Sequence, residues 1–263
     1  MYINDLPVSS VSSLIREIDL CASSGLAITG GEPVLVIDRV IEICRTLKSL
    51  YGQDFHIHMY TNIAHLTRTV LEKLYNTPLD ELRLHVVSPD VVSRLLPALK
   101  LLRKCASFDI GLEVPALPDM ADSIINVVEL LYENEIISFV NLNEVDVSES
   151  NEGALRSRGY YIDQDGTVRG SYESALKILN SIRQRGLNLS VHVCCSWTKD
   201  LVQIGLRYFI RNIVYSRSCS RVEPDGTLVE AVLNGKHVHP SVGVGQLVRY
   251  LPRGNRYLLV EVL

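Results

Sequence analysis

The sequence lacks several features that mark particular classes of protein. None of its apolar runs reaches the roughly 18 residues that a membrane-spanning helix needs, and residues 1–7 show neither the basic start nor the apolar stretch of a signal peptide. With 26 basic and 30 acidic residues, the chain also lacks the basic excess of proteins that bind nucleic acid through bulk charge. We therefore expect a cytoplasmic protein without a membrane partner.

Cysteine is present, but its spacing is not that of a metal site. The six cysteines are scattered, and no two of them form a C-x-x-C pair. Cys194 and Cys195 are adjacent, so on a strand they would point to opposite faces of the sheet. We expect most of the cysteines to be small buried residues, kept reduced in the cytosol.

What the sequence does contain is a regular alternation of strand-like and helix-like segments. The chain has 263 residues, of which 47% are hydrophobic and 21% charged, which is typical of a globular protein with a sizeable core. The alternation predicts a parallel sheet with right-handed crossovers. The strands read as near-continuous apolar runs, which indicates that both faces are covered. The predicted strands are residues 26–29, 55–61, 81–87, 110–114, 138–145 and 189–195, and the predicted helices are 9–21, 38–50, 66–75, 89–105, 120–134, 172–185 and 201–211.

This pattern predicts an α/β fold, a partial (β/α) TIM-like barrel over residues 1–213. A small β extension is predicted over residues 214–263, with a hairpin turn at Glu223-Pro224-Asp225-Gly226. Residues 148–170 read as a polar insertion. Because a helical segment precedes the first recognisable strand, we expect that a first strand is missing. The second strand would then be an open edge through which the chain could pair with another copy.

The Gly30-Gly31-Glu32-Pro33 turn follows the first predicted strand, at the edge of the sheet where barrels of this type bind ligands. The glycines allow positive φ angles and let a ligand approach the backbone. Glu32 supplies a carboxylate that could receive a cationic amino group, and Pro33 starts the next helix. An ordinary β-α turn, with an acidic residue favoured by the helix dipole, is the structural alternative.

This turn, together with later strands that end in Tyr60-Thr61-Asn62 and Val87-Ser88-Pro89, resembles the core of radical S-adenosylmethionine (SAM) enzymes. In that family the Gly-Gly-Glu-Pro turn contacts the amino group of SAM, and polar residues at later strand ends contact its ribose and carboxylate. Residues 111–115 are similar to the segment that packs beside the adenosine. Residues 55–61 and 141–144 resemble an archaeal subgroup related to pyruvate formate-lyase activating enzymes. The resemblance implies SAM-binding roles for Gly30, Gly31, Glu32, Pro33, Thr61, Asn62, Ser88 and Glu113.

The chain departs from this family at the iron–sulfur cluster. The family holds a 4Fe-4S cluster with a C-x-x-x-C-x-x-C loop after the first strand, and no segment of this chain has that spacing. The resemblance implies an intact parent that cleaves SAM to a 5′-deoxyadenosyl radical, which acts on an unknown substrate. We expect the present chain to bind SAM without ligating the cluster, because residues upstream of Met1 have been lost. A cluster-free relative and a non-catalytic nucleotide-binding module are the alternatives.

Two further groups of residues are candidates for chemistry. Loops that follow predicted strands supply possible substrate contacts, namely Glu144, Glu149, Asn151, Cys195 and Lys199. His56 and His58 form an H-x-H pair on one face of a strand. With His85 and His192 they could line a barrel interior and bind a metal, which would give a metal-dependent hydrolase or lyase. Histidines satisfied within the core are the simpler interpretation of this pair.

Overall fold

The computed structural model describes residues 2–4, 6–8, 10–216, 218–234, 236–242, 246–253 and 256–262. The chain forms two compact units, one of Ser24–Ser196 and one that combines Met1–Ser23 with Trp197–Leu263. The boundary expected at residue 213 stays a prediction. Within the described residues, every helix is too short or too polar to cross a membrane.

The larger unit is built on a six-stranded parallel sheet. The strand order follows the chain, and each strand pairs in parallel with the next. All six predicted strands are present, and the predicted α/β class with a partial TIM-like barrel is confirmed. The strands are β3 (Gly25–Ile28), β4 (His56–Asn62), β5 (Glu81–His85), β6 (Asp109–Pro115), β7 (Phe139–Asn143) and β8 (Ser190–Cys194).

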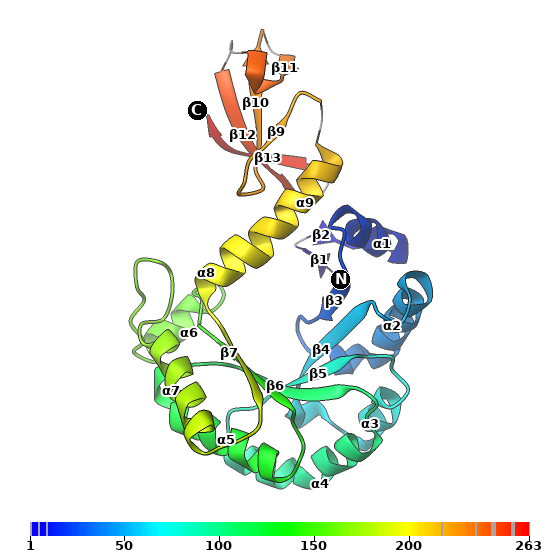
Figure 1. Cartoon of the computed structure of the whole chain (residues 1–263), viewed down its shortest axis with the longest axis vertical. Coiled ribbons are helices and arrows are strands. Elements are labelled where there is room, and N and C mark those ends of the chain that lie inside the picture. Colours follow the sequence, from blue (N-terminus) through cyan, green and yellow to red (C-terminus); the bar gives the residue numbers. More distant parts are fainter. Residues whose placement is uncertain are drawn as a thin grey trace. The chain divides into compact units, whose positions relative to one another are not determined.

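Helices cover the outer side of this curved sheet (Figure 1). They are α2 (Ile37–Tyr51), α3 (Arg68–Leu74), α4 (Pro89–Cys105), α5 (Ala121–Glu133) and α7 (Ser171–Gln184), with short 3₁₀ helices at Pro33–Val36, Ile63–His65 and Pro118–Met120. Helix α4 has the bounds that the sequence predicts, with Pro89 in its first turn, where a missing N–H is tolerated. The polar insertion contains a helix that the sequence did not predict, α6 (Glu152–Ser157).

The two faces of the sheet differ, which corrects the expectation of strands that are apolar throughout. On β4, Ile57 and Met59 are fully buried, whereas His56, His58 and Tyr60 alternate with them and are only partly buried. Successive side chains of a strand point to opposite faces. The helices therefore bury one apolar face, while the inner face carries polar side chains. This inner face positions the candidate site.

The smaller unit combines two helical regions with antiparallel strands. Arg211 Nε donates to Glu17 Oε1 at 3.0 Å, and both side chains are about 95% buried, so this ion pair ties α1 (Val11–Leu20) to α9 (Gly205–Tyr215). The predicted hairpin is confirmed, because β9 (Arg221–Val222) pairs with β10 (Leu228–Leu233) across the turn before Thr227. The last predicted helix is displaced, because α9 continues to Tyr215.

The elements of the smaller unit are α1 (Val11–Leu20), α8 (Ser196–Thr198), a π-helical segment (Lys199–Ile204), α9 (Gly205–Tyr215), β1 (Tyr2–Ile3), β2 (Leu6–Pro7), β9 (Arg221–Val222), β10 (Leu228–Leu233), β11 (Lys236–Val238), a 3₁₀ helix (Pro240–Val242), β12 (Gln246–Arg253) and β13 (Arg256–Val262).

Candidate functional site

The turn after β3 leaves its backbone open on one side. Gly30 has a φ of +122°, a conformation that residues with a side chain rarely adopt. A Cβ added at Gly30 or at Gly31 would meet nothing within 4 Å. The glycines therefore keep space free in front of the main chain, which is what close approach of a ligand requires.

The carboxylate of Glu32 links this turn to the end of β4. Glu32 Oε1 accepts hydrogen bonds from Thr61 Oγ1 at 2.7 Å and from the backbone N–H of Val34 at 3.4 Å, and Oε2 accepts from the backbone N–H of Asn62 at 3.0 Å. A carboxylate has about four acceptor positions, so these three donors leave about one for a ligand. Glu32 thus fixes the spacing between two strand ends as well as offering negative charge.

A pocket of about 420 Å³ lies at these strand ends. It brings together seven of the eight residues for which SAM contacts are predicted, and Ser88 is absent from its described lining. Ser88 instead precedes the first turn of α4. The lining residues are Thr29, Gly30, Gly31, Glu32, Pro33, Tyr60, Thr61, Asn62, His85, Glu113, Val114, Pro115 and Asn143.

Glu113 forms part of the pocket wall and is held by donors from two neighbouring strands. Its carboxylate accepts from Arg83 Nη1 at 2.9 Å, from Asn141 Nδ2 at 3.0 Å and from Asn143 Nδ2 at 2.9 Å. Arg83 Nη1 also donates to the hydroxyl of Tyr60 at 3.1 Å. Burial, followed by the nearby charge of Glu113, raises the pKa of Tyr60, so its hydroxyl stays protonated.

Three of these inner-face residues were not predicted as candidates from the sequence, namely Arg83, Asn141 and Asn143. Arg83 shares a face of β5 with His85, and Asn141 shares a face of β7 with Asn143, in both cases by the two-residue period of a strand. That period is the signal that would have found them. It was missed because the strands were read as apolar on both faces.

A second pocket, of about 360 Å³, contains two of the predicted substrate residues. Glu144 and Cys195 line it together with residues of the polar insertion and α7, namely Asp163, Asp165, Thr167, Val168, Arg169, Gly170, Tyr172 and Glu173. Glu144 also accepts a hydrogen bond from the backbone N–H of Ser196 at 2.8 Å. Because Asn143 lines the first pocket and Glu144 the second, the end of β7 contributes to both.

The other predicted substrate residues lie elsewhere. The side chain of Asn151 accepts from the backbone N–H of Ser148 at 2.8 Å and donates to the backbone carbonyl of Asp146 at 2.9 Å, so it stabilises the loop itself. Glu149 is exposed in the same loop. Lys199 belongs to the smaller unit. Their roles in substrate binding stay predictions.

The cysteines do not fit an iron–sulfur cluster, which needs several thiolates close together. Burial raises the pKa of the Cys44 thiol to about 12, and burial together with Glu17 raises that of Cys21 to about 11. Both side chains are therefore neutral thiols. Among the described residues, the one group of at least three possible metal ligands contains no cysteine. The residues present fit SAM and do not fit the cluster.

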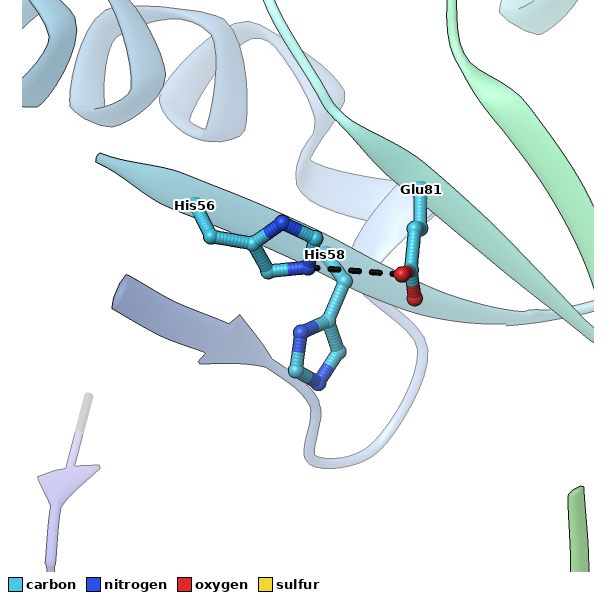
Figure 2. Close-up of side chains that lie close together, drawn as sticks. All are labelled: His56, His58 and Glu81. Atoms are coloured by element: carbon cyan, nitrogen blue, oxygen red, sulfur yellow. Dashed lines mark ion pairs between the residues drawn. The ribbon is translucent and has the colours of Figure 1, made fainter. Parts of the chain in front are cut away.

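That one group consists of His56 and His58 on β4 and Glu81 on β5, on the inner face of the sheet (Figure 2). His56 Nε2 lies 3.6 Å from Glu81 Oε1. Burial is the main cause that lowers the pKa of His58 to about 4. His85, which was grouped with the pair, instead lines the pocket at the strand ends.

Comparison with known proteins finds a curated relative and solved structures to which the chain is similar. No family model matches the chain. Over 242 residues the chain is 31% identical to the "putative glycyl-radical enzyme activating enzyme" of Methanocaldococcus jannaschii, and the match covers 89% of this chain and 63% of that protein. The chain thus spans less than two thirds of the length of this relative.

Two solved structures show the same fold. SuiB of Streptococcus suis bound to S-adenosylmethionine has a TM-score of 0.50 and 16% identity, covering 76% of this chain and 44% of SuiB. SuiB bound to its precursor peptide SuiA has a TM-score of 0.53 and 17% identity, covering 78% of this chain and 46% of SuiB.

The chain therefore shares the fold of SuiB, and its curated relative is named a "putative glycyl-radical enzyme activating enzyme". These findings bear out the resemblance to radical SAM enzymes stated from the sequence. A metal-dependent hydrolase or lyase is not favoured by these comparisons.

Proposed function

We propose that this chain binds S-adenosylmethionine in the pocket at the ends of β3 to β7, as the SAM-binding part of a radical SAM activating enzyme. The observation that carries the proposal is the turn at Gly30 and Gly31, whose open backbone lines a pocket of about 420 Å³. Both glycines leave room for a ligand, and the two carboxylates of the pocket are already held in place.

The chain's own residues divide the binding work. The turn at Gly31 offers backbone groups and a residual acceptor position on Glu32 to the amino group of SAM. Asn62 and Thr61 lie at the end of β4, where the ribose or carboxylate would reach them. The apolar wall of Val114 and Pro115 suits the adenine ring. Each of these assignments matches a polar or apolar part of SAM to the chemistry of the lining.

For these 263 residues we propose binding of SAM and no chemical step. A 4Fe-4S cluster, when bound by an intact enzyme of this class, supplies the electron that cleaves SAM. Its thiolate ligands are not part of this sequence, which lacks the C-x-x-x-C-x-x-C spacing. We infer that radical formation on a substrate needs cluster ligands from outside this chain. The second pocket, with Glu144 and Cys195, is the proposed substrate side.

Equilibrium dialysis with labelled SAM tests the proposal. We expect one binding site per chain, with a dissociation constant of about 0.1 mM, or about −5.5 kcal/mol, because the cluster's contacts are absent. Gly31→Ala fills the open space without strain and should weaken binding at least 10-fold while the protein stays folded. Gly153→Ala, which also meets nothing within 4 Å but lies in α6, is the matched control and should bind normally.

Two results would contradict the proposal. One is the absence of saturable binding to the folded wild-type chain. The other is equal affinity for SAM in the wild type and in Gly31→Ala, which would place SAM elsewhere on the protein.

A further inference from the structure

The inner face of the sheet carries a second polar cluster, separate from the SAM pocket. It consists of His56, His58 and Glu81, near the amino ends of β4 and β5. The pocket lies at the other end of these strands, beyond Thr61. A strand rises about 3.3 Å per residue, so His58 and Asn62 are about 13 Å apart along β4. The cluster therefore has no part in the proposed contacts with SAM.

We propose that His56, His58 and Glu81 bind a divalent transition-metal ion, with Zn²⁺ as the best match. One possible ligand atom from each residue lies within 4.8 Å of the others. Ligands around a tetrahedral Zn²⁺, at about 2.0–2.1 Å from the ion, are about 3.4 Å apart. Side-chain movements of about 1 Å thus close the site. Two imidazoles and one carboxylate are a common zinc donor set that leaves one position open.

The hydrogen bonds of His58 leave one ring nitrogen available. His58 Nε2 faces the hydroxyl of Tyr60 at 3.4 Å. His58 Nδ1 is buried, and the described part of the chain offers it no hydrogen-bond partner. A buried polar atom without a partner is costly and rare. A metal ion at Nδ1 would satisfy it, and the contact between Nε2 and Tyr60 is the kind of second interaction that orients metal-binding histidines.

The carboxylate of Glu81 is oriented in the same way. Arg83 Nε and Nη2 donate to Glu81 Oε2 at 2.9 and 2.8 Å, which leaves Oε1 directed toward His56 (Figure 2). The charge of Arg83 is shared with Glu113, so Glu81 is not its only counterion. Arg83 also contacts the Tyr60 hydroxyl. Arg83 and Tyr60 therefore position two of the three proposed ligands.

The test is a titration of the metal-stripped, folded chain with Zn²⁺ in competition with a chromophoric chelator. We expect one equivalent to bind. His58→Ala should weaken binding at least about 100-fold, because loss of a ligand exceeds the 10- to 100-fold effect of losing a supporting residue. Tyr60→Phe should weaken it about 10-fold. His65→Ala, an exposed histidine of the 3₁₀ helix at Ile63–His65, is the control and should bind as the wild type does.

A Co²⁺ titration distinguishes this cluster from the free cysteines. The proposal predicts ligand-field bands without a thiolate-to-metal charge-transfer band. Thiolate bands, the absence of one-equivalent binding, or unchanged affinity in His58→Ala would overturn it. If circular dichroism shows that His58→Ala is unfolded, His56→Gln serves instead, because the His56 side chain is 44% exposed and its replacement leaves the core intact. SAM binding by His58→Ala and by His56→Gln is unaffected under this proposal, because neither histidine lines the SAM pocket. The failure of this proposal and the failure of the proposed function are therefore distinguishable.

Discussion

Two polar regions share the inner face of one sheet, and they differ in how their groups are satisfied. At the strand ends, Glu32 and Glu113 each accept three hydrogen bonds from the protein itself. Nearer the amino ends, His58 has a buried nitrogen with no partner among the described residues. Carboxylates that accept several hydrogen bonds from the protein shape a cavity by holding strands in place, whereas a buried nitrogen without any partner indicates a missing ligand. The hydrogen-bonded carboxylates therefore build the pocket, and the unpartnered histidine nitrogen is the group that would bind a ligand from outside.

The largest expected effect comes from removing the carboxylate that holds three strands together. Glu113→Ala should lower the free energy of unfolding by about 3 kcal/mol, because Arg83 and two asparagine amides lose a partner in a site that is 13% exposed. Urea denaturation measures this change. Glu152→Ala breaks an exposed pair with Arg156 and should lose less than about 1 kcal/mol. Equal losses in the two variants would mean that Glu113 does not organise the inner face.

A smaller loss is expected at the turn. Glu32→Ala removes the acceptor of the Asn62 amide and the nearer, 2.7 Å acceptor of the buried Thr61 hydroxyl. This loss should cost about 2 kcal/mol of stability and lower the affinity for SAM at least 10-fold. Glu32→Gln keeps one acceptor oxygen and should lose less of both. Chemical denaturation and dialysis on the same preparations provide the two values. Wild-type affinity in Glu32→Ala would show that the turn is not a binding element.

The smallest expected effect, that of Asn143→Ala, tests whether the SAM pocket and the His56 cluster are independent. Asn143→Ala removes one of three donors to Glu113, so stability should fall by about 1 kcal/mol and affinity for SAM by a few fold. Affinity for Zn²⁺ should not change, because Asn143 is not part of the His56 cluster. A parallel loss of Zn²⁺ binding, measured by chelator competition, would mean that the two regions act as one.

The sequence predicted the order of elements in the larger unit because each strand carries enough buried apolar residues to be recognised. It placed Gly30, Glu32 and Thr61 in a common site through the resemblance to a known family. It missed Arg83 and Asn141, since their function depends on which strands become neighbours. The partner of Glu32 is 29 residues away in the chain, and only the parallel register of β3 and β4 brings them together.

The smaller unit was harder to predict, because its local sequence preferences differ from the structure that its long-range contacts stabilise. Residues 213–215 are Ile, Val and Tyr, which all favour a strand, yet α9 continues to Tyr215. Its polar face is held by Arg211, whose ion pair with Glu17 spans 194 residues of sequence. Such a long-range contact can outweigh the local propensity for a strand, and no local sequence pattern predicts the contact. The short strands β1 and β2 were missed because two residues give no period.

SAM binding by this chain should not depend on a metal ion. Calorimetric titration of SAM into the chelator-treated protein, and into the same protein saturated with Zn²⁺, tests it most directly. We predict one SAM per chain with the same affinity in both titrations. Binding that disappears after chelator treatment and returns with a metal ion would contradict the account.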